Sequence, residues 1–197
     1  MKGTRNLTLM IIGAIVLIFF VLGCSGYNGL VRQDEKVKKS WNDVNAAYQL
    51  RTDLVGNLVN TVKGAANFEK TTLTQLVEAR AKATSVNLKA DDLTPENIAK
   101  FQAAQSQLSG SLSRLLAVVE NYPDLKATQN FQQLQGSLEG IENSIRSSRM
   151  KFNEAVNTYN VKVRSFPMNM LSGMFGFHKK EGFKADEGAD KAPKVQF

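Results

Sequence analysis

The chain has 197 residues, of which 43% are hydrophobic and 22% charged, a balance typical of a protein with a packed core. The formal net charge is +7, but Lys and Arg alternate with Asp and Glu instead of gathering in one basic block, so no nucleic-acid partner is expected. One cysteine, Cys24, excludes an intramolecular disulfide, and one histidine, His178, leaves too few ligands for a catalytic zinc ion. No nucleophile–base pair or paired-carboxylate motif is recognisable, so we predict no catalytic residues, no metal, no cofactor and no enzyme.

The first predicted element is an apolar stretch at the N-terminus. No charged residue lies between Arg5 and Arg32, and the residues Leu7–Leu22 (LTLMIIGAIVLIFFVL) are almost wholly apolar. Counted from Leu7 to Gly26, the stretch reaches the roughly 20 residues with which an α-helix crosses the hydrocarbon core of a bilayer. We therefore expect residues 1–26 to form a membrane anchor.

Three forms of this anchor are open. We favour an uncleaved membrane-spanning helix. The alternative is a lipoprotein signal, because Val21–Cys24 (VLGC) resembles the site at which cleavage leaves a lipid-modified cysteine, here Cys24. A cleaved secretory signal is least favoured, since no A-x-A-like site is present. Lys2 and Arg5 favour a cytoplasmic N-terminus and a domain outside the cytoplasm, although basic residues from Arg32 to Lys39 oppose this orientation.

After the anchor, apolar residues recur at steps of four and three, which places them on one helix stripe that faces partner helices. In the first long helix the stripe consists of Val37, Trp41, Val44, Tyr48, Arg51, Val55, Leu58, Val62 and Ala65. A shorter second helix carries Leu73, Leu76, Arg80 and Ala83. The pattern stops at Asn87–Asp92, which predicts a connection at these residues.

The third predicted helix begins at Thr94-Pro95-Glu96. Thr can cap the helix, Pro loses only an N–H that would be unpaired, and the acid faces the positive end of the helix dipole. Its stripe consists of Ile98, Phe101, Gln105, Leu108, Leu112, Leu115, Val119 and Tyr122. The fourth helix, which ends before Pro167, carries Phe131, Leu134, Leu138, Ile141, Ile145, Ser148, Phe152, Ala155, Tyr159 and Val163.

No segment alternates with a period of two, so the predicted fold is all-α. We expect an elongated antiparallel four-helix, coiled-coil-like bundle over residues 27–167, joined to an N-terminal transmembrane or signal-anchor helix. At 1.5 Å per residue, the second and third helices together match the roughly 60 Å of the first or the fourth. The fourth helix should therefore end near the membrane, where the first one leaves it.

Residues 168–197 form the last predicted region. The Met- and Phe-rich stretch Pro167–Phe177 (PMNMLSGMFGF) either caps the apolar end of the bundle, which we favour slightly, or lies among lipid headgroups. Both hold at once if that end of the bundle faces the membrane. The polar tail from Glu181 to Phe197 is expected to be mobile or loosely docked.

Several motifs together resemble the LemA family. They are YNGLV at Tyr27–Val31, Trp41, RTDLVGNLV at Arg51–Val59, EAR at Glu78–Arg80, ENYPDLKA at Glu120–Ala127, Asn130-Phe131, Leu134, Arg149, Phe152-Asn153, Tyr159-Asn160 and Phe166-Pro167. They cover nearly the whole chain in the family's order and spacing. The sequence departs at Gly56, where the family usually has Pro, and this should relax a helical kink. The resemblance implies an antiparallel helical bundle tethered to a bacterial inner membrane, without an established catalytic residue or cofactor.

Polar residues on or beside the stripes form a candidate cluster. Its members are Arg51, Asp53, Glu78, Arg80, Asn130 and Arg149. A charged residue on a seam between helices needs a partner or must reach water along its own stem. We favour a salt-bridge network that fixes the helix register over a polar pocket for a ligand.

The functional hypothesis is a membrane-anchored, non-enzymatic scaffold or adaptor of the LemA type. Its expected partners are membrane lipid and either other proteins or further copies of itself. The expected location is the bacterial inner (plasma) membrane, with most of the chain extracytoplasmic. The alternative is a ligand-sensing helical domain that signals at the membrane through the Arg51–Arg80 region.

Overall fold

The computed structural model describes residues 2–64 and 68–184, without the side chains of residues 2–9, 15, 18, 19 and 22. The helices are α1 (Lys2–Lys63), α2 (Lys70–Ser85), α3 (Pro95–Val119), α4 (Pro123–Lys126), α5 (Gln129–Arg164) and α6 (Met168–Leu171). No strand occurs in the part of the chain that is described. The prediction of an all-α helical bundle is confirmed.

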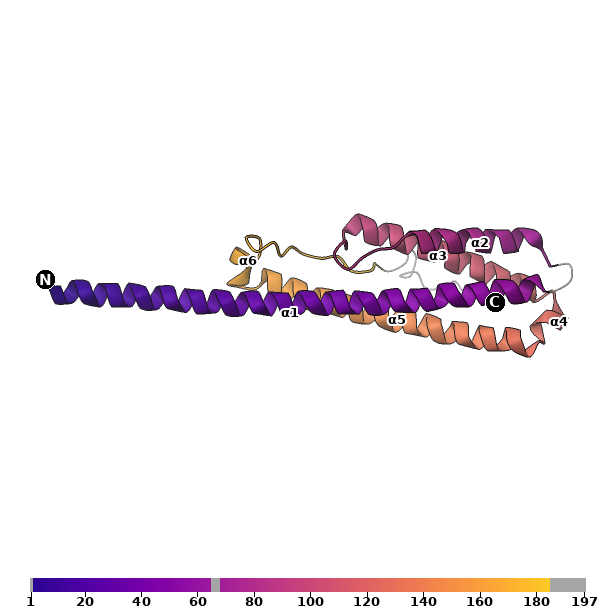
Figure 1. Ribbon diagram of the computed structural model, residues 1–197, viewed down its shortest axis with the longest axis horizontal. Coiled ribbons are helices and arrows are strands. Elements are labelled where there is room, and N and C mark those ends of the chain that lie inside the picture. Colours follow the sequence, from indigo (N-terminus) through magenta and orange to yellow (C-terminus); the bar gives the residue numbers. More distant parts are fainter. Residues whose placement is uncertain (1, 65–67, 185–197) are drawn as a thin grey trace, which may run out of the picture.

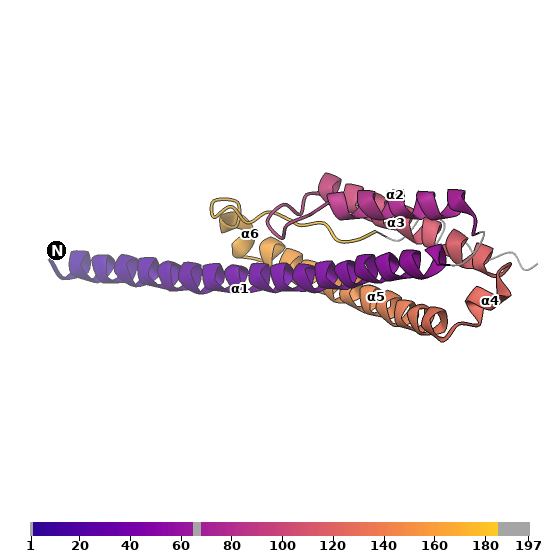
Figure 2. The same ribbon diagram turned by 45° about the vertical axis from the view of Figure 1, so that its right-hand side comes forward.

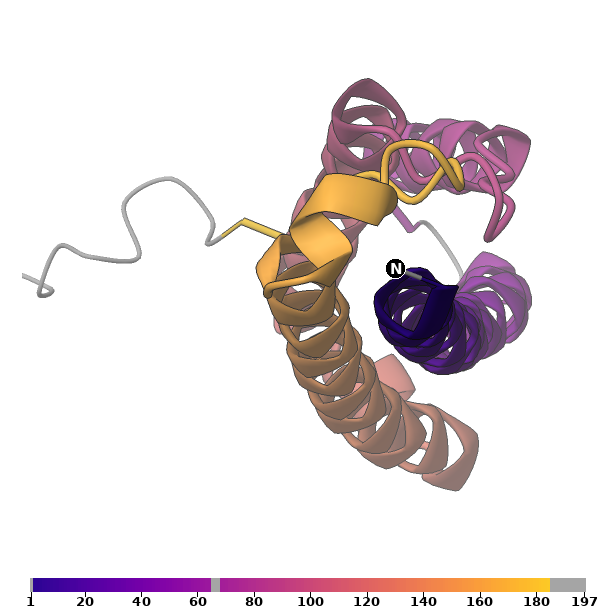
Figure 3. The same ribbon diagram turned by 90° about the vertical axis from the view of Figure 1, so that its left-hand side faces the viewer.

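Helix α1 is the longest helix, and α5, α2 and α6 pack against it (Figure 1). Its 62 residues correspond to roughly 90 Å at 1.5 Å per residue. Helix α5 runs back along α1, and α2 and α3 form an antiparallel pair of which α2 also contacts α1. Seen along the long axis in Figure 3, α5, α3 and α2 curve around one side of α1. This order of directions is the one that the helix lengths predict.

The predicted stripes form the core of the bundle. In α1, every stripe position from Val37 to Val62 is buried, including Arg51, whereas Ala65 lies outside the described residues. In α3, the stripe is buried from Ile98 to Val119. Among the stripe residues of α2 and α5, the fully buried ones are Leu76, Ala83, Phe131, Leu138, Ile145, Phe152, Tyr159 and Val163. The heptad spacing therefore placed the apolar contacts between the helices correctly.

Trp41 organises the part of the core nearer the N-terminus. Its ring packs edge-on against Phe101 and Phe152, with centroids 5.3 and 5.2 Å apart, and stacks on Phe183 at 5.8 Å. The indole Nε1 donates a hydrogen bond of 2.8 Å to the Leu88 carbonyl. A buried Trp needs such a partner for its N–H. This bond holds the connection between α2 and α3 against α1.

Helix boundaries follow local signals in two places and depart from them in one. Thr94 caps α3, as predicted, because its side chain accepts a 3.2 Å hydrogen bond from the Asn97 N–H. Helix α5 ends at Arg164, before Pro167, also as predicted. Helix α3, however, ends at Val119 and not at Tyr122, since a turn there leads into the short helix α4.

The chain after α5 folds back onto the end of the bundle. Met168 and Ser172 are buried, and Met168 packs so closely on Gly26 that a Cβ there would overlap its thioether. Helix α5 therefore returns to the level at which α1 leaves the apolar stretch. Phe183, in the predicted polar tail, is also buried, so residues 168–184 are part of the bundle. The rest of the tail, residues 185–197, lies outside the described residues.

The N-terminal part of α1 extends beyond all the other helices (Figure 2). Seven of the sixteen side chains in Leu7–Leu22 are outside those described. Within the described part of the chain, no helix combines the length and the hydropathy needed to cross a membrane. The anchor predicted for residues 1–26 stays a prediction.

Candidate functional site

Arg51 is a charged side chain in the core of the bundle, with 2% of its surface exposed. Its Nη1 donates to Ser109 Oγ at 2.8 Å and to Glu142 Oε1 at 3.2 Å. Its Nη2 donates to the side-chain and main-chain oxygens of Gln105, and the guanidinium lies 4.8 Å from the centre of the Tyr48 ring. Its Nε is buried without a hydrogen-bond partner among the described residues. Helix α1 is thus linked to both α3 and α5 at this residue.

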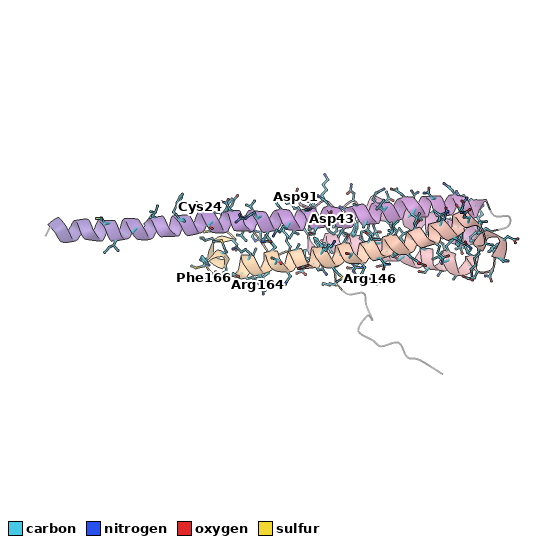
Figure 4. The ribbon with its side chains drawn as sticks, turned by 90° about the horizontal axis from the view of Figure 1, so that it is seen from below. Cys24, Asp43, Asp91, Arg146, Arg164 and Phe166 are labelled. Atoms are coloured by element: carbon cyan, nitrogen blue, oxygen red, sulfur yellow. The ribbon has the colours of Figure 1, made fainter. Side chains whose placement is uncertain are left out.

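An open groove of about 1100 Å³ lies beside Arg51, between α3 and α5. Its charged lining residues are Arg51, Arg146, Arg149, Lys184 and Glu142. Four cationic groups therefore face one carboxylate. Figure 4 marks Arg146 on α5, midway along the bundle. Such an excess of guanidinium and ammonium groups attracts anions, and carboxylates fit the donor geometry of Arg.

An extended segment, residues 178–184, runs along α5 toward this groove. Asn160 donates to the Lys180 carbonyl at 2.8 Å and accepts from the Lys180 N–H at 2.9 Å. Asn153 binds Phe183 in the same way, donating at 3.1 Å and accepting at 2.8 Å. The Tyr159 hydroxyl donates to the His178 carbonyl at 2.9 Å. The helix therefore holds the main chain of this segment at His178, Lys180 and Phe183, and at the last two residues both polar groups of one Asn side chain take part.

The segment ends at the groove with an aromatic contact and a shared acceptor. The rings of Phe183 and Phe152 pack together with centroids 5.6 Å apart. The Arg149 guanidinium lies 4.7 Å from the centre of the Phe183 ring. The Lys184 carbonyl accepts hydrogen bonds from Arg149 at 3.3 Å and from Gln102 at 3.2 Å. Gln102 and Arg149 both line the groove. The chain is therefore fixed at the mouth of the groove by residues of its walls.

A chain of ion pairs holds the same segment to α1. Lys180 Nζ lies 2.9 Å from Asp34 Oδ1. Lys38 Nζ lies 3.6 Å from Asp34 Oδ2 and 2.8 Å from Asp91 Oδ1. The hydrogen bond between Lys38 and Asp91 raises the pKa of Lys38 and lowers that of Asp91. Burial, together with the charge of Asp34, raises the pKa of Tyr159 to about 12. Tyr159 is therefore a neutral donor at physiological pH.

The six residues of the predicted polar cluster do not all lie together in the structure. Arg51 and Arg149 line the groove together. Arg80 donates to the Thr52 carbonyl at 2.9 Å, which ties α2 to α1 on another side of the bundle. The other three members, Asp53, Glu78 and Asn130, are exposed. The predicted lipid-attachment residue, Cys24, is exposed on α1 where the helix leaves the bundle (Figure 4).

Sequence reasoning missed several residues that build this site. Glu142 and Ser109, the partners of Arg51, lie beside the stripes and have no distinguishing pattern. Asn153 and Asn160 were noticed only as part of the family resemblance. Their spacing of seven residues, two helical turns, was the available signal, because it places both amides on one face of α5 next to Phe152 and Tyr159.

Among the described residues, no group of three or more His, Cys, Asp or Glu could hold a metal ion.

The family model described as "LemA family" matches residues 40–197. The chain belongs to the LemA family. The identification made from the motifs is thereby confirmed. This LemA-family chain is 25% identical over 200 residues to magnetosome protein MamQ 2 of Paramagnetospirillum magneticum, an overlap of 92% of this chain and 74% of the relative.

Two further relatives extend the comparison. The LemA-family chain is 25% identical over 206 residues to magnetosome protein MamQ of Magnetospirillum gryphiswaldense, covering 96% of this chain and 76% of the relative. It is 24% identical over 170 residues to protein LemA of Metamycoplasma hominis, covering 86% and 74%. The similarity thus extends over most of the chain.

Proposed function

We propose that this LemA-family protein is a membrane-anchored scaffold or adaptor without enzymatic activity. The observation that supports it best is the N-terminal part of α1, which extends beyond the bundle and carries exposed apolar side chains. Met10, Ile11, Ile12, Val16, Leu17, Phe20 and Val21 are each between 52% and 72% exposed. A continuous apolar surface of this kind is unfavourable in water and is a mark of contact with lipid or with another protein.

The end of the bundle from which this projection starts has a collar of aromatic and Met side chains. Phe166 and Met174 are both 81% exposed and Met170 is 69% exposed. The Tyr27 ring lies edge-on against Phe175, with centroids 5.2 Å apart. Aromatic rings collect at the headgroup level of bilayers, and nearby basic residues meet anionic lipid. Figure 4 places Phe166, Arg164 and Cys24 at this same end, which favours its contact with a lipid surface.

Two forms of attachment satisfy this arrangement. In the first, the N-terminal part of α1 stays in the bilayer, with Lys2 and Arg5 on the cytoplasmic side and the bundle outside the cytoplasm. In the second, the exposed Cys24 carries an acyl group after removal of the preceding residues. Either form holds the collar against the inner membrane of a bacterium.

Shape and chemistry support the scaffold role. The bundle is long, and its buried charged residue, Arg51, links α1 to α3 and α5. Similarity to proteins named for the magnetosome supports a part in a cellular structure. The expected partners are membrane lipid and either other proteins or further copies of this chain. Nucleic acid is not proposed.

The anchor is tested with the full-length protein expressed in bacteria. The double substitution Ile12→Lys and Val16→Lys places two charges in the projection, and its control is Leu50→Lys, at a side chain that is 57% exposed on the bundle. We expect wild type and control to stay in membranes after a high-salt wash and the double variant to be released. Wild type that washes free would contradict the proposal. A double variant that stays bound would exclude the retained helix, because the acylated form no longer contains residues 12 and 16.

Two further measurements complete the test. The intact mass of membrane-bound protein separates a retained helix from an acylated Cys24, because only the first keeps Met1–Gly23. For the scaffold role, crosslinking in cells and the size of the purified protein in detergent are decisive. A monomer that captures no partner would remove this role.

A second candidate function is ligand sensing, and the groove beside Arg51 is the observation that favours it. The cationic side chains of its lining, Arg146 and Arg149 among them, would pair with an anionic ligand. A thermal-shift screen of the full chain with small anions and metabolites tests this function. An unchanged unfolding temperature across the screen would exclude it.

A further inference from the structure

The extended segment 178–184 is bound by the helices in the manner of a separate peptide. Asn153 and Asn160, two turns apart on α5, each donate to one main-chain carbonyl of the segment and accept from the N–H of the same residue. We call this pair the asparagine clamp. Its bonds recognise an extended main chain, so the specificity of such a site comes from the pockets for side chains beside it.

Two side chains of the segment enter such pockets. Lys180 Nζ lies 2.9 Å from Asp34 Oδ1 of α1. The Phe183 ring is 7% exposed and lies between Trp41 of α1 and Phe152 of α5, with centroids 5.8 and 5.6 Å away. The site therefore offers a carboxylate for a basic residue and, three positions later, an aromatic pocket for a ring.

The position between them has no room for a side chain. A Cβ at Gly182 would lie 2.6 Å from Asn153 Oδ1. The same oxygen accepts the Phe183 N–H at 2.8 Å, so it cannot move away without loss of a bond of the clamp. The site thus fits the pattern Lys-x-Gly-Phe, which residues 180–183 supply.

The connection that leads to the segment allows it to change course. Residues 172–177 join α6 to the segment, and Gly176 has a φ of 77°, in a region that glycine adopts at no steric cost. A second copy carries the same four residues and makes the same contacts, and exchange of an identical element is a low-cost route to dimers. Attachment to one membrane raises the effective concentration of that second copy.

We propose that the asparagine clamp and its two pockets form a recognition site for an extended Lys-x-Gly-Phe segment, and that two copies of the chain exchange their 178–184 segments through it. The second copy's Lys180 then pairs with Asp34, and the second copy's Phe183 stacks on Trp41. This inference rests on the scaffold role proposed above, for which it names the partner and the contact.

Recognition between separate molecules is tested first, with the full-length protein in detergent micelles. In Phe183→Ala the chain's own segment lacks its ring. Trp41 is the single Trp of the sequence, so its fluorescence reports on the emptied pocket. The probe is a synthetic peptide with the sequence of residues 178–184 (HKKEGFK). We expect a saturable change of fluorescence as the peptide is added.

Two substitutions show whether the peptide binds in the described way. The peptide with Gly182→Ala, and the protein with Asn153→Leu, should each raise the dissociation constant about tenfold or more, because each loses a bond of the clamp. Asn157→Leu is the matched control, at an exposed position of α5 one turn from the clamp residue, and should leave the dissociation constant unchanged.

Exchange between copies is tested with two complementary full-length chains. The first keeps its segment but carries Asn153→Leu and Asn160→Leu, and the second keeps the clamp but carries Phe183→Ala. Each alone should be monomeric by light scattering, and their mixture should form a heterodimer. Gly182→Ala replaces Phe183→Ala in a repeat, because it leaves every ring of the core in place, and circular dichroism verifies that all chains are helical.

Three results would overturn the proposal. Trp41 fluorescence that does not respond to the peptide shows that the pocket takes no segment from outside. An equal response to the Gly182→Ala peptide shows that the site does not read the pattern. A mixture of complementary chains that stays monomeric shows that the segment binds only within its own chain. None of these results bears on other protein partners, which crosslinking in cells detects separately.

Discussion

Arg51 is a charged side chain in the core of the bundle. We predict that its ion pair with Glu142 offsets part of the free-energy cost of burying this charge. The Arg51 side chain is 2% exposed and that of Glu142 is 40% exposed, with 3.2 Å between Nη1 and Oε1. For two unit charges at this distance, the attraction is about 5 kcal/mol at an effective dielectric constant of 20 and about 1 kcal/mol in water. Because water reaches Glu142, we expect a coupling free energy of about 1–3 kcal/mol.

A double-mutant cycle measures this coupling. Arg51→Met keeps most of the side-chain volume and leaves the buried Gln105 amide without its donor. Glu142→Gln leaves a buried cation with neutral acceptors only. The double variant has no buried charge, so it should lose less stability than the sum of the single variants, by about 1–3 kcal/mol. The free energy of unfolding comes from urea titration of the full chain in detergent, followed by the circular dichroism of the helices.

The control for this cycle is an exposed arginine with a similar bond. Arg114 donates to Gln75 Oε1 at 2.8 Å on the surface, and Arg114→Met should change the free energy of unfolding by no more than about 0.5 kcal/mol. A coupling between Arg51 and Glu142 below about 0.5 kcal/mol would refute the reasoning. Gln105 and Ser109 would then be sufficient to hold the cation.

Three further predictions concern single positions. Because the pKa of Tyr159 rises from 10.0 to about 12 on folding, its share of stability is present below about pH 10 and is lost as the pH rises toward 12. Tyr159→Phe should remove that part of the pH slope in urea titrations at about pH 9 and about pH 11, and equal slopes would contradict the prediction. Gly110→Ala should stabilise α3 by about 0.5–1 kcal/mol, since a Cβ there meets nothing within 4 Å. Gly26→Ala should stabilise the protein less, because the thioether of the buried Met168 must move to admit the new Cβ. Thermal unfolding of the two variants tests this contrast, which equal shifts of the midpoint would disprove. Thr94→Ala should cost about 1 kcal/mol through loss of the cap of α3 and Thr94→Ser should not, and equal unfolding free energies for the two would argue against the cap.

The sequence was most informative where a short-range rule applied. The heptad steps from Val37 to Val62 fixed which face of α1 is buried, because the period of a helix determines it. Thr94 and Pro167 marked helix boundaries through local backbone chemistry. The turn after Val119 was misplaced by three residues, since the short helix α4 leaves no periodic signal.

The residues of the candidate site could not all be predicted from the heptad pattern. Arg51 was recognised as an exception on its stripe, but its partners on α3 and α5 are set by the register between helices, which no spacing within one helix reveals. Phe183 was assigned to a polar tail because its neighbours in sequence are polar. Its place beside Trp41 is supported by two hydrogen bonds between its own main chain and the Asn153 side chain. A non-helical segment has no pattern from which such bonds could be predicted.

The continuity of α1 has a mechanical consequence. The helix has no proline between Lys2 and Lys63, so the same rigid element serves as projection and as backbone of the bundle. Such an element acts as a lever arm: a tilt of about 10° at Lys2 moves Lys63 by roughly 16 Å, and a rotation about its axis turns Trp41 by the same angle. Any contact that fixes the orientation of the first turns of α1 therefore also sets the position of the far end of the bundle.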